Sequence, residues 1–206
     1  MNRTLTCYCG ASFEHDFPDQ VDLDRGDLLD SVLDGDFLAV DCPECGKRLK
    51  PEFPVRLTGR SIDADLFLVP ELDRGGLSRG DLPYSLPDAK RIVVGYPELV
   101  EKLRILLARL DDQAVEVIKY HLLSRAVESE EAQERDPRVA FHGVEGGRLV
   151  FHIAGLNEDA IAVSRVPRET YDKALAKVEE LALEEPFSAF LKPPHVSLSR
   201  LVGGRL

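Results

Sequence analysis

The four cysteines of the chain carry its clearest chemistry, and they fall into two close pairs. The first pair is Cys7-Tyr8-Cys9-Gly10, and the second is Cys42-Pro43-Glu44-Cys45-Gly46. Each pair suits a tight turn that aims two thiolates at one ion, and the glycine after the second cysteine eases that turn. Together Cys7, Cys9, Cys42 and Cys45 predict one zinc ion bound by four sulfurs.

The predicted metal site is closed. Zinc with four thiolates keeps no open coordination position, so it cannot present a bound water as a nucleophile, and we expect a structural role. Iron or another metal, or four thiols without metal, stay open as alternatives. Disulfides are disfavoured, because no apolar run resembling a secretion signal opens the chain and we therefore expect the reducing cytoplasm.

The overall charge argues against two classes of partner. The formal net charge is -11 and the pI is near 5.0, which creates a field that repels phosphate backbones and anionic lipid. No stretch is apolar enough to span a membrane. The cations Lys47, Arg48 and Lys50 follow the second cysteine pair, and we expect them to offset its charge on a solvated face rather than to bind nucleic acid.

The elements around the cysteines are short. Apolar residues at 28, 29, 32 and 33 share one helical face, and Gly35 suits the left-handed position that ends a helix. Strands are expected at 37–40, 53–57 and 65–69. Pro54 places the second of these at a sheet edge, because proline cannot donate to a ladder.

A long loop and two helices are expected next. Glycine and proline are frequent in residues 70–90, which predicts a loop before a strand at 91–94. Pro97 then opens a helix, and Asp111 or Asp112 can cap the following one. The two helices should pack as an antiparallel hairpin. Their apolar stripes are Leu99, Leu103, Leu106, Leu107 and Leu110 on the first, and Val115, Ile118 and Leu122 on the second.

A polar run at 128–137 predicts the boundary between two domains, 1–128 and 138–206. In the second domain, 139–142 and 149–152 flank Gly146-Gly147 as a β-hairpin, followed by a strand near 161–163 and one helix after Pro167. The tail from Pro186 is expected to dock loosely, either on its own domain or on another protein. The fold class is therefore α+β: a four-cysteine zinc ribbon, a central helical hairpin and a small C-terminal hairpin-plus-helix unit.

Histidines are weaker candidates than the cysteines. His142 and His152 lie on the two arms of the predicted hairpin. A two-residue turn places them on opposite faces and a three-residue turn on the same face, so the sequence leaves their relation open. His15 lies near the first cysteine pair as a substitute ligand. No nucleophile, phosphate-loop or metalloprotease motif occurs, so we assign no catalytic and no organic-cofactor residue.

At Cys7 to Gly46 the sequence resembles the CpXC-domain family, whose members have no assigned biochemical function. The shared pattern is a first cysteine pair, a helix ending near glycine, a strand, and then Cys-Pro-x-Cys-Gly. The resemblance continues to about residue 128. It departs at the first pair, where one residue instead of two separates Cys7 from Cys9, which implies a tighter first turn.

The same cysteine spacing is similar to the zinc centre of the redox-regulated holdase chaperone family. In that family oxidation ejects zinc and forms disulfides between neighbouring cysteines, which unfolds the region. The leading hypothesis is a non-catalytic cytoplasmic module that binds another protein and uses zinc to hold its fold. A thiol redox switch is the alternative, and association with a second copy stays open.

Overall fold

The computed structural model describes residues 2–128, 136–156 and 160–202. The chain forms two compact units, residues 1–100 and 101–206. Their division falls within helix α3 (Gly95–Leu107), whereas the sequence placed a domain boundary after residue 128. Most of the polar run at that predicted boundary lies outside the described residues. Helices and strands are mixed through both units, as predicted for an α+β chain.

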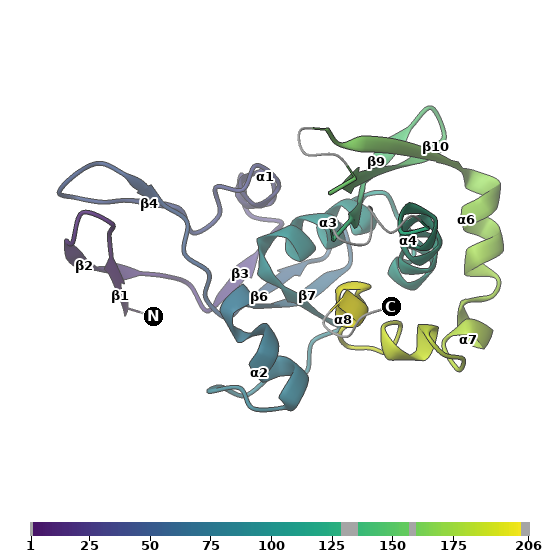
Figure 1. Ribbon diagram of the computed structural model, residues 1–206. Helices are drawn as coiled ribbons and strands as arrows, with labels where there is room; N and C mark the ends of the chain where they lie inside the picture. Colours follow the sequence, from purple (N-terminus) through teal and green to yellow (C-terminus); the bar gives the residue numbers. More distant parts are fainter. Residues whose placement is uncertain (1, 129–135, 157–159, 203–206) are drawn as a thin grey trace. The chain divides into compact units, whose positions relative to one another are not determined.

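The first unit combines a four-stranded sheet with two small hairpins (Figure 1). The sheet has the order β3-β6-β7-β8, and the hairpins are β1-β2 and β4-β5. Helix α1 ends before Gly35, whose φ is 73°, as the sequence predicted. The bounds are β1 Asn2–Thr6, β2 Ser12–Asp16, β3 Gln20–Asp22, α1 Leu28–Leu33, β4 Val40–Asp41, β5 Arg48–Leu49, β6 Val55–Gly59, β7 Ala64–Val69, η1 Glu71–Asp73, α2 Arg74–Arg79 and β8 Arg91–Val94.

The prediction that Pro54 makes its strand an edge strand is wrong. Strand β6 lies inside the sheet, parallel to β3 on one side and antiparallel to β7 on the other. Pro54 stands before the first residue of the strand, so its missing N–H interrupts no ladder bond. Val55 and Leu57 are fully buried. The strand begins two residues later than the pattern suggested, so the proline lies outside its ladder.

The expected loop at 70–90 contains the 3₁₀ helix η1 and the helix α2. Arg74 anchors this segment, because its guanidinium donates to both carboxylate oxygens of Glu71 at 2.6 and 2.8 Å and to Glu98 at 3.0 Å. Gly76 allows a close approach, since a Cβ there would lie 2.9 Å from the backbone oxygen of Asp81. Gly76 therefore lets the segment after helix α2 turn back close to the helix.

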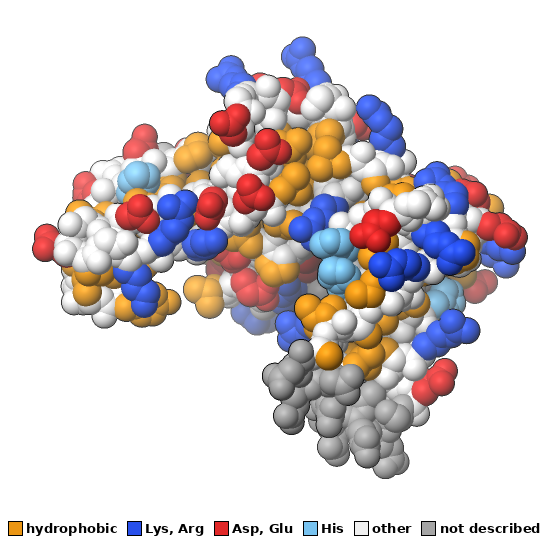
Figure 2. Space-filling view, turned by 90° about the horizontal axis from the view of Figure 1, so that it is seen from above, with side chains coloured by type: hydrophobic (Ala, Val, Ile, Leu, Met, Phe, Trp, Pro, Cys, Tyr) orange, Lys and Arg blue, Asp and Glu red, His pale blue; other side chains and the backbone are white. Residues whose placement is uncertain are grey.

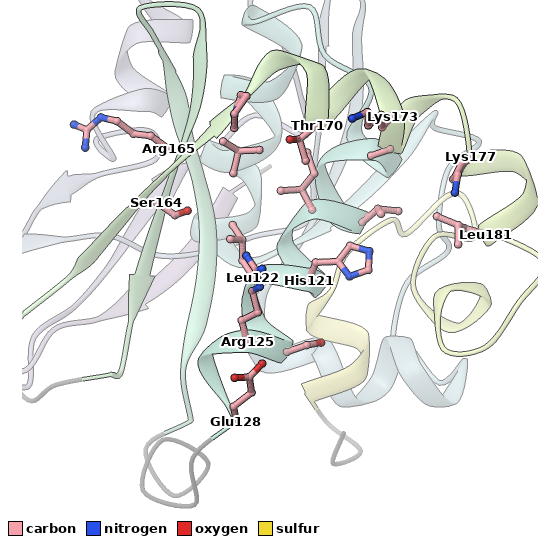
Figure 3. A pocket seen from close by; sticks show the side chains of 16 residues that line it. His121, Leu122, Arg125, Glu128, Ser164, Arg165, Thr170, Lys173, Lys177 and Leu181 are labelled. Atoms are coloured by element: carbon pink, nitrogen blue, oxygen red, sulfur yellow. The ribbon is translucent and has the colours of Figure 1, made fainter.

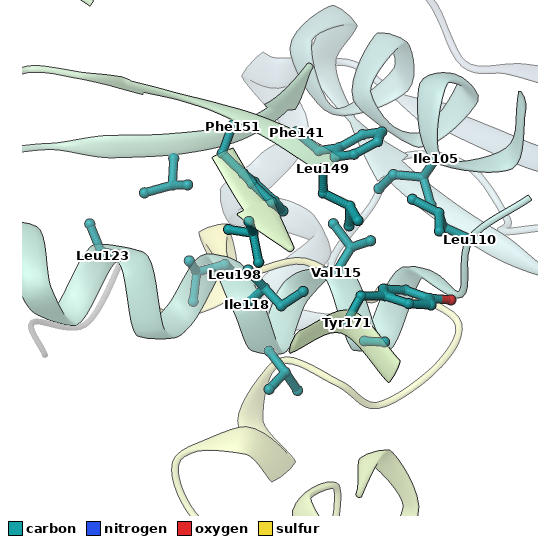
Figure 4. Close-up of a cluster of buried hydrophobic side chains, with 14 of the residues drawn as sticks. Ile105, Leu110, Val115, Ile118, Leu123, Phe141, Leu149, Phe151, Tyr171 and Leu198 are labelled. Carbon is teal, nitrogen blue, oxygen red and sulfur yellow. The ribbon is translucent and has the colours of Figure 1, made fainter. Parts of the chain in front are cut away.

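The second unit packs a three-stranded antiparallel sheet, in the order β11-β10-β9, with helix α4. Figure 4 shows Phe141 and Phe151 turned from the strands into the same cluster as Val115 and Ile118 of α4. Asp111 caps α4, accepting a hydrogen bond from the backbone N–H of Ala114. The bounds are α4 Asp112–Ala126, β9 Arg138–Glu145, β10 Arg148–Ala154, β11 Ala162–Pro167, α6 Arg168–Leu175, α7 Val178–Leu181, η2 Phe187–Ala189 and α8 Ser199–Val202.

The C-terminal region differs from its prediction in two respects. The expected single helix after Pro167 is two short helices, α6 and α7, and Leu175 at the end of α6 is exposed. The tail is not loosely docked, because its apolar side chains belong to the core of the second unit. Buried tail residues in that core are Phe187, Phe190, Leu191 and Leu198.

A polar network also ties the tail to the second unit. Lys102 donates to Asp112 at 2.7 Å and to the backbone oxygen of Val196 at 3.0 Å. The carboxylate of Glu116 accepts from the backbone N–H of Leu198 at 2.7 Å. Because these groups are buried, each bond satisfies a polar atom that water cannot reach.

None of the helices in the described residues is long and apolar enough to cross a membrane.

Candidate metal centre

The four cysteines converge as predicted. Their Sγ atoms all lie within 4.8 Å of one another, with Cys7 to Cys45 at 3.6 Å and Cys9 to Cys42 at 3.8 Å. A tetrahedron with metal–sulfur bonds of about 2.3 Å places its sulfurs about 3.8 Å apart. A disulfide needs about 2.05 Å, so these separations match a shared ion and not a covalent bond. The four thiols can therefore hold one metal ion.

Two β-hairpins position the sulfurs. Cys7 and Cys9 occupy the turn between β1 and β2, and Cys42 and Cys45 occupy the turn between β4 and β5. The hairpins lie side by side, although their cysteine pairs are at least 33 residues apart in sequence (Figure 1). Each turn contributes one buried cysteine, Cys7 or Cys42, and one exposed cysteine, Cys9 or Cys45.

The shorter first turn closes by the same pattern as the second. The backbone N–H of Cys42 donates to the oxygen of Lys47, and the N–H of Cys7 donates to that of Ala11, one residue sooner. Gly10 and Gly46 follow the two pairs with φ of 90° and 68°, a region that favours glycine. The missing residue between Cys7 and Cys9 is therefore absorbed inside the turn, and both sulfurs still reach the cluster.

Backbone amides prepare the second turn for charged sulfur. Hydrogen bonds from the backbone N–H groups of Cys45 and Glu44 lower the pKa of the Cys42 thiol to about 7. The backbone N–H of Lys47 acts in the same direction on Cys45, but the adjacent thiols of Cys9 and Cys7 outweigh it and raise the pKa of Cys45 to about 12. A bound cation would favour the thiolate at all four positions.

The cations after the second pair are engaged with neighbouring side chains. Arg48 lies 3.4 Å from Asp36 and 3.7 Å from Asp41, and Lys50 lies 3.3 Å from Asp36. The ammonium of Lys47 stands 4.4 Å from the ring centre of Tyr8, which links the two cysteine turns. Lys47, Arg48 and Lys50 thus sit on a solvent-exposed face of mixed charge.

One side of the centre is open. The exposed residues Cys9 and Cys45 border a shallow hollow of about 600 Å³, together with Phe13, Pro43 and Glu44. Tyr8 lies at the tip of its turn and is 86% exposed. The four sulfurs therefore face one another, and exposed aromatic, proline and acidic side chains lie around them.

Two further arrangements lie outside the cysteine cluster, and sequence reasoning missed the first and left the second open. A groove of about 720 Å³ in the second unit lies between α4, β11 and α6 (Figure 3). Its lining includes the basic side chains of His121, Arg125, Arg165, Lys173 and Lys177. These basic side chains are scattered along the chain, so no local sequence motif predicts their grouping. The second arrangement is a contact between His142 and His152, whose rings stack at 4.0 Å.

His15 does not join the cysteines. Its ring packs on Phe17 at 4.7 Å, and within the described residues the cluster of potential metal ligands comprises the four cysteines alone.

Comparison with known proteins identifies the family of the chain. Residues 5–119, more than half of the 206, match the family described as CpXC protein. An "Uncharacterized protein" of Treponema pallidum (strain Nichols) is 28% identical over 190 residues, which cover 82% of this chain and 85% of that protein. That similarity therefore extends beyond the family region. No solved structure matches. The family match includes both cysteine turns and ends within α4, and the chain belongs to the CpXC family.

Proposed function

We propose that the chain is a non-catalytic, cytoplasmic protein-interaction module whose N-terminal hairpins are held together by structural zinc bound to Cys7, Cys9, Cys42 and Cys45. The supporting observation is the sulfur geometry, with contacts of 3.6 and 3.8 Å where tetrahedral zinc needs about 3.8 Å. Zinc suits four thiolates because it is soft and has no preferred geometry other than the tetrahedral one that they form.

The hairpins need such an ion. Strands β4 and β5 have two residues each, and β1 and β2 have five each. Two-stranded ribbons of this length are marginal in water, because they bury too little apolar surface to offset their ordering. A metal that joins the two turns supplies the missing free energy.

The exposed rim of the centre supports a protein partner. Tyr8, Phe13 and Pro43 place apolar and aromatic surface beside the metal, and tyrosine is among the residues that most often dominate protein interfaces. Glu44 adds an acidic group to the same rim. A basic, partly apolar surface of another protein fits this combination better than nucleic acid, whose phosphates the acidic chain repels.

Replacing Tyr8 with alanine is expected to reduce capture of the partner at least about tenfold, as loss of an interface hot spot does. The measurement compares proteins recovered on immobilised wild-type and Y8A chains from cells that contain this protein. Leu183→Ala is the matched control, because Leu183 is 85% exposed but lies in the second unit. Equal recovery by wild type and Y8A, or recovery of nucleic acid without protein, would refute the interaction surface.

A thiol redox switch is a second candidate, favoured by the exposure of Cys9 and Cys45. Two thiolates would pass two electrons to hydrogen peroxide, an S–S bond would form, and peroxide would leave as two hydroxide ions while zinc is released. If this function operates, dilute peroxide is expected to release zinc within minutes, as detected with a metal-sensing dye, and a thiol reductant with added zinc should restore the centre. Zinc that stays bound with four unmodified thiols rules the switch out.

A further inference from the structure

We propose that His142 and His152 form a second metal site, a two-imidazole chelate for a divalent late first-row transition ion on the outer face of the β9–β10 hairpin. The site lies in the second unit and uses none of the four cysteines. It does not depend on the function proposed for the zinc centre.

A β-bulge creates the pair. The hairpin has the two-residue turn Gly146-Gly147, with Glu145 opposite Arg148, which alone would place the histidines on opposite faces. The register shifts between Val150 and Phe151, so that Phe151 faces Phe141, and His142 becomes the extra residue of strand β9.

The shift has a packing reason. Each strand carries the dipeptide Phe-His, and with the bulge both phenylalanines enter the core, where their rings meet at 5.6 Å. Both histidines then share the outer face, and the partner of His152 in the ladder is Ala140, two residues from His142. The two histidines are therefore diagonal cross-strand neighbours, close enough for long side chains to touch.

The two rings are close enough to share an ion. Their centres are 4.0 Å apart and their planes differ by 18°. An ion bound to one nitrogen of each ring at about 2.0–2.1 Å needs those nitrogens roughly 3–3.5 Å apart and must lie in the plane of both rings. The stacked imidazoles must therefore rotate about their side-chain bonds so that their planes converge on the ion. His142 is exposed and His152 half-buried, and Figure 2 shows adjacent histidine side chains at the molecular surface. An ion can therefore reach the pair from solvent.

The surroundings set the strength and type of the site. Burial, His152 and Arg104 lower the pKa of His142, so its imidazole is neutral at pH 7 and can bind a metal. The positive charge of Arg104 disfavours a bound cation. The carboxylate of Glu145 favours one, but it is already paired with the guanidinium of Arg165 at 3.4 Å. Two imidazoles leave further coordination positions to water or a partner group. We therefore infer an exchangeable site for ions that favour nitrogen, such as Ni²⁺, Cu²⁺ or Zn²⁺.

Titration of the zinc-loaded full chain with Ni²⁺ at pH 7.5, followed by calorimetry, tests the chelate. Ni²⁺ is chosen because it does not oxidise thiols. His142→Gln and His152→Gln are each expected to weaken the strongest Ni²⁺ site by about tenfold or more, because binding the second imidazole is an intramolecular step. The double variant should be no weaker than either single variant.

His121→Gln is the matched control, since His121 is an exposed histidine of the same unit that packs against Tyr120 and Phe187 instead of another histidine. It should leave the strongest Ni²⁺ site unchanged. The chelate is refuted if either single variant binds Ni²⁺ as tightly as His121→Gln does. It is also refuted if the loss of Ni²⁺ binding free energy in the double variant is the sum of the losses in the two single variants. Thermal unfolding of each variant shows whether the hairpin remains folded, and an unfolded variant is replaced by His142→Asn or His152→Asn.

Discussion

Replacing Cys42 with serine is expected to lower the zinc content from about one ion per chain to nearly none and to unfold both N-terminal hairpins. Cys42 is one of the two buried cysteines, and three thiolates plus a serine hydroxyl do not rebuild a tight tetrahedral site. Structural zinc contributes roughly 10–16 kcal/mol to folding in zinc-finger peptides, far more than short two-stranded ribbons can replace. Metal analysis by mass spectrometry and amide hydrogen exchange measure the two effects.

The loss should be confined to the part of the chain that the metal holds. Amides of β1, β2, β4 and β5 are expected to exchange at nearly unfolded rates, while those of β9 and β10, which have their own apolar core, keep their protection. Tyr8→Ala is the control within the same turn, because it removes a large side chain but no sulfur. A C42S protein that still binds one zinc ion with full protection would disprove the structural centre.

The features that the sequence predicted well are local ones. Turns that aim two sulfurs at one ion are specified by cysteine spacing and a following glycine, so Cys7, Cys9, Cys42 and Cys45 could be placed together before any fold was known. The end of α1 at Gly35 and the cap of α4 by Asp111 depend on a few adjacent residues in the same way. In each case the chemistry and the structure lie within one turn.

The features that the sequence did not predict depend on distant residues. Helix α2 forms despite Gly75 and Gly76, because Arg74 is held by Glu71 and Glu98 and because the returning chain passes close to Gly76. The bulge at His142 satisfies the packing of two phenylalanines from different strands. Periodicity along one segment contains none of this information, since the deciding partner is elsewhere in the chain.

Charge burial in α4 is another non-local feature. Lys119 and Glu116 are only 4% and 2% exposed, although a lysine and a glutamate on a helix would ordinarily face solvent. The ammonium of Lys119 donates to Glu101 and to Glu116, each at 2.9 Å. The other oxygen of Glu101 accepts from the backbone N–H of Phe141 at 2.6 Å, so the charges connect α3, α4 and β9. The network is visible only once these elements are assembled.

Replacing Lys119 with methionine is therefore expected to destabilise the second unit by about 3–5 kcal/mol, because Glu116 and Glu101 lose the cation that compensates their burial. Burial raises the pKa of Glu116, and Lys119 opposes that rise. Burial alone would lower the pKa of Lys119, but the carboxylates of Glu101 and Glu116 raise it above its usual value. Urea unfolding followed by circular dichroism, with hydrogen exchange of β9 and β10, measures the loss of unfolding free energy.

The pH dependence and a surface control separate this electrostatic explanation from simple loss of packing. Without Lys119, the pKa of Glu116 rises further above its unfolded value, so the native variant binds an additional proton and regains stability as pH falls. The deficit of K119M relative to wild type should thus be smaller at pH 5 than at pH 8. Lys173→Met removes an ammonium 2.7 Å from Glu169, but both side chains are more than 70% exposed, and its unfolding midpoint should barely change. A K119M deficit independent of pH, or no larger than that of K173M, would show that the buried charges do not stabilise the unit as a network.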